Sequence, residues 1–221
     1  MTKKKTESKV AKSNIELSDA SPEKENEEIL EPIRKSQIKR IKVELTGKTP
    51  ILMNNPKSMI SDEEEKASSV ISTTKKRNSK LEAEGRTYRM KDGTLYVPAE
   101  ALKGCLVNAA SYKKFGKYSA KPIIAGCVQV LPMQISLNTK EFEVDERTVV
   151  IMRRGRVIRA RPMIENWKIS FELEYDAGFI QSGNLIREIL EEGGQRVGIM
   201  DFRPAKMGSF GMFKITKWEE L

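Results

Sequence analysis

Hydrophobic and polar positions alternate most clearly in two segments of the chain, and both segments predict half-buried strands. In the first, apolar Ile41, Val43 and Leu45 alternate with charged residues. In the second, large apolar residues occupy every other position: Trp167, Ile169, Phe171, Leu173 and Tyr175. A period of two matches one buried face of a strand, so we expect these aromatic side chains in the core and not on a binding surface.

Two other segments show the spacing of amphipathic helices. After Pro98, which suits a first helical turn, the apolar stripe consists of Leu102, Cys105, Leu106 and Ala109. A second helix is predicted over 185–192 and is expected to end at Gly193-Gly194. Further strands are predicted over 128–137, over 148–152 and 157–161 as a hairpin, and near 210–215. The order of strand, helix, strands, strand, helix and strand predicts an α+β, ferredoxin-like fold of the split βαβ type.

Two polar segments lie outside this pattern. Residues 1–37 contain no aromatic residue and few large apolar ones. They bury too little surface to offset the entropy of ordering, so we expect a disordered tail. Residues 54–94 are also polar and predict a long, mobile insertion within a single domain over 38–221.

Composition narrows the possible functions. Residues 1–37 are neutral overall, so the formal charge of +9 of the 221-residue chain belongs entirely to residues 38–221. A basic domain favours a polyanionic partner such as nucleic acid. The chain has no histidine and two cysteines, which excludes Ser-His-Asp, Cys-His and histidine-containing metal sites within it. We expect a reducing, cytoplasmic environment, with no secretory signal and no membrane span.

Two basic clusters are candidate contacts for phosphate groups. The first has no acidic residue between 147 and 164 but six arginines: Arg147, Arg153, Arg154, Arg156, Arg159 and Arg161. One guanidinium group can bind two phosphate oxygens at once, and a hairpin would present several guanidinium groups together. The alternative is a solvated turn that protects an edge strand. The second cluster interleaves lysines with tyrosines, and a solvated surface explains it equally well: Tyr112, Lys113, Lys114, Lys117, Tyr118 and Lys121.

The segment 197–213 combines glycines with two cations, Arg203 and Lys206. Glycines such as Gly208 and Gly211 would let backbone amides approach a ligand closely. The alternative explanation is a mobile turn followed by a bulge.

Three segments of the chain together resemble the RAMP superfamily, which includes the RNA-binding backbone subunits of CRISPR effector complexes. Residues 96–106, Tyr-Val-Pro-Ala-Glu-Ala-Leu-Lys-Gly-Cys-Leu, are similar to the superfamily segment Ile-Pro-Gly-Ser-Ser-Leu-Lys-Gly-x-Leu-Arg. Residues 198–213 are similar to its terminal glycine-rich loop, and residues 39–53 to its opening strand and loop. Residues 203–213 are also similar to the ending of small phage- or virus-encoded proteins of unknown function.

The resemblance implies an RRM-like core with residues 54–94 as a thumb. Subunits of this kind stack as a filament along single-stranded guide RNA. Lys103, Arg203, Lys206 and the hairpin arginines would then line one groove and neutralise the phosphate backbone of single-stranded RNA or DNA. The expected partners are nucleic acid, further copies of the chain and other effector subunits. No cofactor and no membrane are implied.

Two other classes of function stay open. Some members of the superfamily cleave RNA with an aspartate, and here Asp62 or Asp201 would have to hold a metal ion. The four adjacent acids at 62–65 are more typical of a solvated run, and Asp201 more plausibly pairs with Arg203 or caps a turn. We therefore expect no enzyme and no metal site. In the other class, the basic surface binds an acidic protein or another copy of the chain in a viral assembly.

Overall fold

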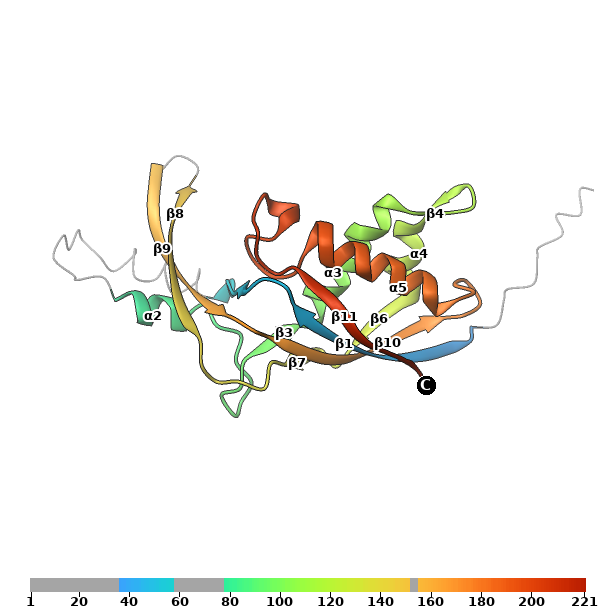
Figure 1. Cartoon of the computed structure of the whole chain (residues 1–221), viewed down its shortest axis with the longest axis horizontal. Coiled ribbons are helices and arrows are strands. Elements are labelled where there is room, and N and C mark those ends of the chain that lie inside the picture. Colours follow the sequence, from blue (N-terminus) through green and yellow to red (C-terminus); the bar gives the residue numbers. More distant parts are fainter. Residues whose placement is uncertain (1–35, 58–77, 152–154) are drawn as a thin grey trace, which may run out of the picture. The chain divides into compact units, whose positions relative to one another are not determined.

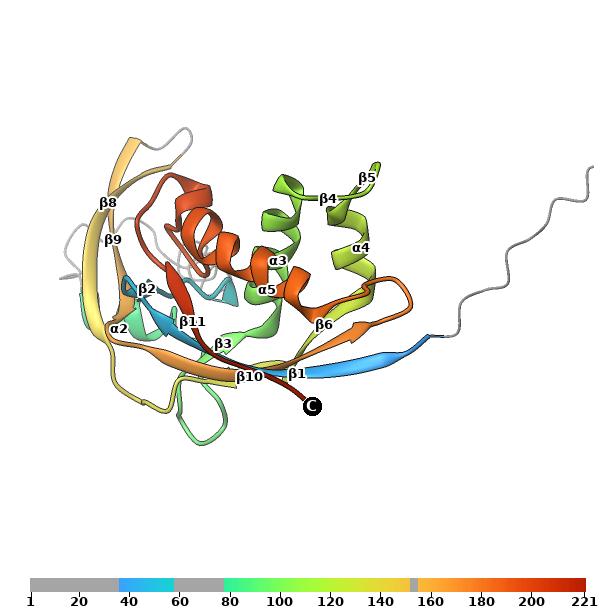
Figure 2. The ribbon, with the colours of Figure 1, turned by 45° about the vertical axis from the view of Figure 1, so that its right-hand side comes forward.

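The computed structural model describes residues 36–57, 78–151 and 155–221, and Figure 1 shows their arrangement. Four strands form an antiparallel sheet in the order β11-β1-β10-β6. They are β1 (Ile38–Gly47), β6 (Val128–Leu131), β10 (Lys168–Asp176) and β11 (Phe213–Glu220). Three helices lie over one face of this sheet (Figures 1 and 2): α3 (Ala99–Ala109), α4 (Ala120–Cys127) and α5 (Gly183–Glu192). The prediction of a mixed α and β chain is confirmed.

The core lies between this sheet and its helices, where the alternation along the sequence predicts it. Val43 of β1 is paired with Phe171 of β10, and Leu45 is paired with Ile169. All four side chains are buried, because residues opposite each other in an antiparallel pair share a face. Trp167 and Tyr175 are buried as well, so the prediction that these aromatic residues belong to the core is confirmed.

Two predicted boundaries are wrong. The strand predicted over 128–137 is divided by Pro132 into β6 and β7 (Gln134–Ser136), and β7 pairs with β3 (Tyr96–Pro98) in a separate sheet. The helix α5 ends at Glu192 with Gly193 as its C-cap, as predicted, and the chain then continues as a π-helical turn, η2 (Gly193–Val197). A Cβ atom at Gly194 would lie 2.5 Å from the carbonyl oxygen of Phe213, so the absence of a side chain allows η2 to approach β11. The last strand begins at Phe213, three residues later than predicted.

A second sheet extends beyond the first. It has the order β2-β9-β8 and consists of β2 (Ile51–Leu52), β8 (Glu143–Ile151) and β9 (Gly155–Ile164). The predicted hairpin over residues 148–161 is confirmed, since Thr148 pairs with Ile158 and Val149 with Val157. A short helix that the sequence pattern did not predict, α2 (Ser79–Glu84), packs against β9.

Parts of the predicted organisation lie outside the described residues. They include nearly all of the tail at 1–37 and residues 58–77 of the segment 54–94. The described residues belong to one compact unit, Arg34–Leu221. Within the described ranges, no helix combines the length and the apolar character that a membrane crossing requires.

Candidate nucleic-acid interface

Residues 198–212, here called the C-terminal loop, connect η2 with β11 through an unusual backbone. The φ angle is positive at Gly198 (70°), Met200 (63°), Phe202 (49°), Met207 (58°) and Gly211 (70°). For side chains other than glycine this conformation costs roughly 1–3 kcal/mol per residue, so it persists only where the surroundings enforce it. Such clusters of strained residues occur preferentially at functional sites.

Hydrogen bonds to the chain after β1 enforce this conformation. The Gly211 amide donates to the carbonyl oxygen of Pro50 (2.8 Å), and the Asp201 amide donates to that of Leu52 (3.0 Å). The Met212 amide donates to Oγ1 of Thr49 (3.0 Å). The C-terminal loop is therefore attached to residues 49–52, which the resemblance also singles out.

The two glycines predicted to contact a ligand serve the packing of the loop itself. A Cβ atom at Gly208 would lie 1.7 Å from the carbonyl oxygen of Phe202, and one at Gly211 would lie 2.0 Å from that of Ile199. Their amides are also engaged, since Gly208 donates to the carbonyl oxygen of Arg203 (3.0 Å). The structure thus assigns both glycines a role in folding the loop, in place of the expected approach of their amides to a ligand.

The two cations of the loop differ in their surroundings. Arg203 is partly buried, and its Nη1 donates to the carbonyl oxygen of Met200 (2.7 Å). Lys206 lies in the short helix η3 (Pro204–Lys206), is exposed, and forms no ion pair with any residue that the structure describes. Met207, next to it, is 96% exposed. The loop therefore presents one oriented guanidinium and one unrestrained ammonium group.

The arginines of the β8–β9 hairpin do not form one unpaired cluster. Arg147 lies directly opposite Arg159, and Arg161 lies on the same face, whereas Arg156 is an exposed residue of the other face. Arg153 and Arg154 lie outside the described residues.

The expectation that no acidic residue neutralises these arginines is wrong for the three that share a face. Arg147 pairs with Asp145 (2.7 Å), Arg161 with Asp201 (3.0 Å) and Arg159 with Glu82 (3.5 Å). Two of these carboxylates come from α2 and from the C-terminal loop, far away in the sequence. Opposite like charges destabilise a strand pair, and these carboxylates offset the repulsion.

Aromatic rings join the hairpin to the C-terminal loop. The Arg147 guanidinium lies 4.5 Å from the ring centre of Phe210 and 5.7 Å from that of Phe202. Phe210 and Phe213 are only 8% and 1% exposed, so neither offers a free face for stacking on a base. Hairpin and loop consequently form one continuous surface.

Lys103, the predicted basic residue of α3, points toward α4. Its Nζ donates to the carbonyl oxygens of Ile124 (3.2 Å) and Val128. Burial lowers the pKa of this ammonium group below its usual value. The structure therefore places Lys103 between two helices and does not bring it to the C-terminal loop.

A pocket of about 350 Å³ lies between the start of α3, the C-terminal loop and the chain that follows β2. The chain two residues after β2 contributes Asn54, the start of α3 contributes Glu100 and the loop contributes Asp201 and Arg203. The complete lining is Asn54, Tyr88, Pro98, Glu100, Ala101, Gly104, Met200, Asp201 and Arg203. Two carboxylates against one guanidinium give the pocket a formally negative lining, although its surroundings are basic.

Tyr88 is a pocket residue that sequence reasoning missed, because it lies in a polar stretch without periodicity. Burial is the main cause that raises its pKa, and the neighbouring Tyr96, Asp201 and Glu100 add to the effect. Its ring packs edge-on against Tyr96 at 5.7 Å. A half-buried tyrosine at this position offers both a ring and a hydroxyl group to a ligand.

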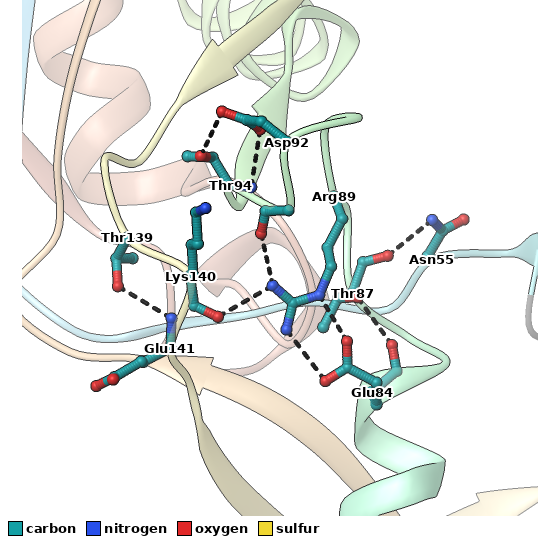
Figure 3. A network of polar contacts seen from close by, with 10 residues as sticks. Asn55, Glu84, Thr87, Arg89, Asp92, Thr94, Thr139, Lys140 and Glu141 are labelled. Atoms are coloured by element: carbon teal, nitrogen blue, oxygen red, sulfur yellow. Dashed lines mark hydrogen bonds and ion pairs between the residues drawn. The ribbon is translucent and has the colours of Figure 1, made fainter.

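A polar network holds the segment that carries Tyr88 (Figure 3). Arg89 donates through Nε and Nη2 to both carboxylate oxygens of Glu84 (2.6 and 3.1 Å). Its Nη1 donates to the carbonyl oxygens of Gly93 (2.7 Å) and Lys140 (3.0 Å). The described end of the segment 54–94 thus has fixed polar contacts.

Two aspartates are the candidate metal ligands of the cleavage alternative. Asp62 lies outside the described residues. Asp201 pairs with Arg161 and not, as expected, with Arg203. Within the described ranges, no group of three or more Cys, Asp or Glu side chains is arranged to hold a metal ion.

No protein-family model matches the sequence, and no curated protein matches it either.

Proposed function

We propose that this protein binds single-stranded nucleic acid, and RNA in preference to DNA. The binding surface lies where the C-terminal loop, the β8–β9 hairpin and the start of α3 meet. The observation that carries this proposal is the convergence of three separate segments on one pocket: the chain at Asn54, the start of α3 and the C-terminal loop. The resemblance to the RAMP superfamily, which includes the start of α3 and the C-terminal loop, supports RNA as the ligand.

We further propose a ferredoxin-like, RRM-like core of the RAMP type. The sheet order β11-β1-β10-β6 supports it, because each crossover then joins two strands that have one other strand between them. Helix α3 lies on the connection from β1 to β6, and α5 on that from β10 to β11. In this proposal residues 54–94 form the thumb, and copies of the chain stack as a cytoplasmic filament, alone or with other effector subunits.

The charges suggest how a nucleotide would bind. Glu100 and Asp201 repel a phosphate group from the pocket, but their oxygens can accept hydrogen bonds from the amino groups of a base. The phosphates would lie at the edge of the pocket, on Arg203 of its lining and on the exposed Lys206. Such contacts give affinity with little sequence preference. Neither a cofactor nor a catalytic step is part of this proposal.

The open face of the four-stranded sheet is a poorer candidate. Two pairs of opposite charges occupy this face: Arg40 with Glu174 (2.6 Å) and Lys168 with Glu44 (2.8 Å). Along the described lengths of β1 and β10, the side chains that alternate with the buried ones include no aromatic residue. Stacking of bases on this face, as in many RRM domains, therefore has no platform there.

The test is binding of labelled single-stranded RNA and DNA, measured by fluorescence anisotropy over a series of salt concentrations. The double variant Arg203→Ala/Lys206→Ala removes two proposed phosphate contacts. We expect weaker binding to every sequence, and a slope of log K against log salt that is shallower by about 1.4, since each contact contributes about 0.7 on a single strand. The control variant Lys42→Ala/Lys91→Ala removes the same charge from exposed positions elsewhere and should leave the slope unchanged.

Equal slopes of log K against log salt for the wild type and the loop variant would show that the C-terminal loop is not part of the interface. A wild-type protein that purifies without nucleic acid and binds no oligonucleotide at low salt would overturn the whole proposal. An interaction with an acidic protein or with another copy would then be the better explanation of the basic surface.

A further inference from the structure

The second basic cluster is not used by the proposed function, and it forms a defined structural unit. The two-residue strands β4 (Lys114–Phe115) and β5 (Tyr118–Ser119) pair through a tight turn at Gly116, whose φ is 58° (Figure 2). Helix α4 follows directly, and the Ser119 hydroxyl accepts a hydrogen bond from the Lys121 amide at its start. We call the exposed side chains of this unit the lysine hairpin: Tyr112, Lys114, Lys117, Tyr118 and Lys121.

The acidic residues of the neighbouring helix α5 do not neutralise the lysine hairpin. Each of the three glutamates of α5 is paired with another cation. The pairs are Glu188 with Lys113 (3.2 Å), Glu191 with Arg187 (3.2 Å) and Glu192 with Arg196 (2.8 Å). Residues 101–140 contain six lysines and no acidic residue. Lys114, Lys117 and Lys121 form no ion pair with any part of the chain that the structure describes, so their charge is left for a partner.

Two tyrosine rings lie beside these lysines and are open to solvent. Tyr112 is 62% exposed and Tyr118 is 75% exposed, so neither ring belongs to the core. The guanidinium of Arg196 lies 6.0 Å from the centre of the Tyr112 ring. The Tyr118 ring has no such contact with any residue that the structure describes. Exposed rings next to unpaired lysines can stack on the planar groups of a charged partner.

The cations and the rings are distributed around the hairpin and not along one side of it. In the β4–β5 pair, Lys114 lies opposite Ser119, and Phe115 lies opposite Tyr118. Paired residues share a face and successive residues alternate between the faces, so Lys114 and Tyr118 belong to opposite faces. The two strands are only about 5 Å apart. A partner that contacts both residues must therefore bend around a narrow pair of strands.

Single-stranded nucleic acid meets these requirements. Each of its units carries a negative phosphate and a planar base, so one strand can contact the lysines and the tyrosine rings in turn. A single strand also bends easily, whereas a duplex has a persistence length of about 150 base pairs. An acidic peptide would neutralise the lysines, but it offers planar groups only at its occasional aromatic residues.

The start of α4 does not offer a phosphate site of its own. The Ala120 amide donates to the carbonyl oxygen of Lys113 (3.2 Å), and the Lys121 amide is engaged by the Ser119 hydroxyl. The third residue of the helix is Pro122, which has no amide hydrogen. Contacts to phosphate at this end of the domain therefore depend on the lysine side chains.

We propose that the lysine hairpin is a second contact for single-stranded nucleic acid, in which bases stack on its two tyrosines and phosphates bind its three lysines. The inference rests on the proposed function for the class of ligand alone, because the lysine hairpin shares no residue with the C-terminal loop or its pocket. The pocket lies at the start of α3 and the lysine hairpin follows its end. The eleven residues of α3 rise by roughly 16 Å, so one strand can reach both surfaces.

The first test removes the rings and measures binding of labelled single-stranded RNA by fluorescence anisotropy. The variant Tyr112→Ala/Tyr118→Ala leaves every charge in place. We expect about twenty-five-fold weaker binding, since each stacked base contributes at least about fivefold, with an unchanged slope of log K against log salt. The matched control Tyr112→Phe/Tyr118→Phe keeps the rings and should bind like the wild type. On an abasic oligonucleotide, which has phosphates but no bases, the alanine variant and the wild type should bind equally.

The second test removes the charges. The variant Lys114→Gln/Lys117→Gln/Lys121→Gln should make the slope of log K against log salt shallower by about 2.1, since each phosphate contact contributes about 0.7 on a single strand. The matched control Lys39→Gln/Lys42→Gln/Lys91→Gln removes three lysines from exposed positions elsewhere and should leave the slope unchanged.

Three outcomes would overturn the inference. In the first, both hairpin variants bind like the wild type while Arg203→Ala/Lys206→Ala lowers the slope, which leaves the proposed function intact. In the second, the lysine variant lowers the slope but the tyrosine variant has no effect, which indicates a surface for charge alone, such as an acidic protein requires. In the third, the wild type binds no oligonucleotide at low salt, which overturns the proposed function as well.

The opposite combination separates the two proposals from the other side. Weaker binding by both hairpin variants, together with an unchanged slope for Arg203→Ala/Lys206→Ala, would support the lysine hairpin and show that the C-terminal loop is not part of the interface.

Discussion

The C-terminal loop and the lysine hairpin are both basic, but they are built in different ways. In the loop region, Arg161 is held by a carboxylate and Arg203 by a carbonyl oxygen, on a backbone attached to residues 49–52. In the lysine hairpin, exposed ammonium groups lie on the two-residue strand β4 (Lys114), in the turn (Lys117) and at the start of α4 (Lys121). A fixed arrangement suits a ligand of defined geometry, whereas mobile charges suit a partner that is defined mainly by its own charge. The same net charge can therefore serve two kinds of recognition in one domain.

The largest expected effect on the free energy of unfolding comes from two glycine substitutions that distinguish backbone strain from close packing. Gly211 and Gly116 both have positive φ angles, 70° and 58°, but only Gly211 is enclosed, whereas a Cβ atom at Gly116 would meet nothing within 4 Å. We expect Gly211→Ala to lower the free energy of unfolding by about 3 kcal/mol, because strain and steric overlap add. Gly116→Ala should cost about 1 kcal/mol, from strain alone.

Urea unfolding of both variants, followed by circular dichroism, measures these differences. Equal losses for the two substitutions would mean that the packing of the loop against Ile199 contributes nothing, and the contrast between a rigid loop and an adaptable hairpin would not hold.

A smaller effect is expected from the ion pairs that support the loop region. The side chains of Arg161 and Asp201 are 14% and 31% exposed, whereas Arg40 and Glu174 on the open sheet face are 57% and 22% exposed. Double-mutant cycles on the free energy of unfolding, with alanine at each position, should give a coupling of about 2 kcal/mol for the first pair. The second pair should give about 0.5 kcal/mol, since solvent screens it more strongly. A coupling for Arg161 and Asp201 no larger than that of the surface pair would show that the loop does not depend on this contact.

The two long strands of the sheet and the helices α3 and α5 could be predicted because their burial is periodic in sequence, whereas α4 (Ala120–Cys127) was not predicted. Alternation locates β1 and β10, and helical spacing locates α3 and α5. The division of the strand over 128–137 was missed, although Pro132 is a visible signal, since proline cannot donate to a ladder inside a sheet. Helix α2 was missed because the helix is short and mostly polar.

The candidate site was less predictable, because its contacts join residues far apart in the chain. The carboxylates that pair with Arg159 and Arg161 are Glu82 and Asp201, and no local pattern connects them. Tyr88 carries no periodic signal either. A charge cluster in a sequence therefore shows where cations are dense, but not which of them are still unpaired after folding.

The smallest expected effect concerns Lys103, which the resemblance places in the nucleic-acid groove and the structure places against α4. In Lys103→Met, the carbonyl oxygens of Ile124 and Val128 lose a donor, so we expect the free energy of unfolding to fall by about 1 kcal/mol. The salt slope of RNA binding should stay that of the wild type, because this ammonium group contacts carbonyl oxygens and not phosphate. Thermal unfolding and anisotropy titrations on the same preparation measure both quantities. A slope shallower by about 0.7 would instead make Lys103 a phosphate contact, and the basic groove would then extend from the C-terminal loop along α3 toward the lysine hairpin.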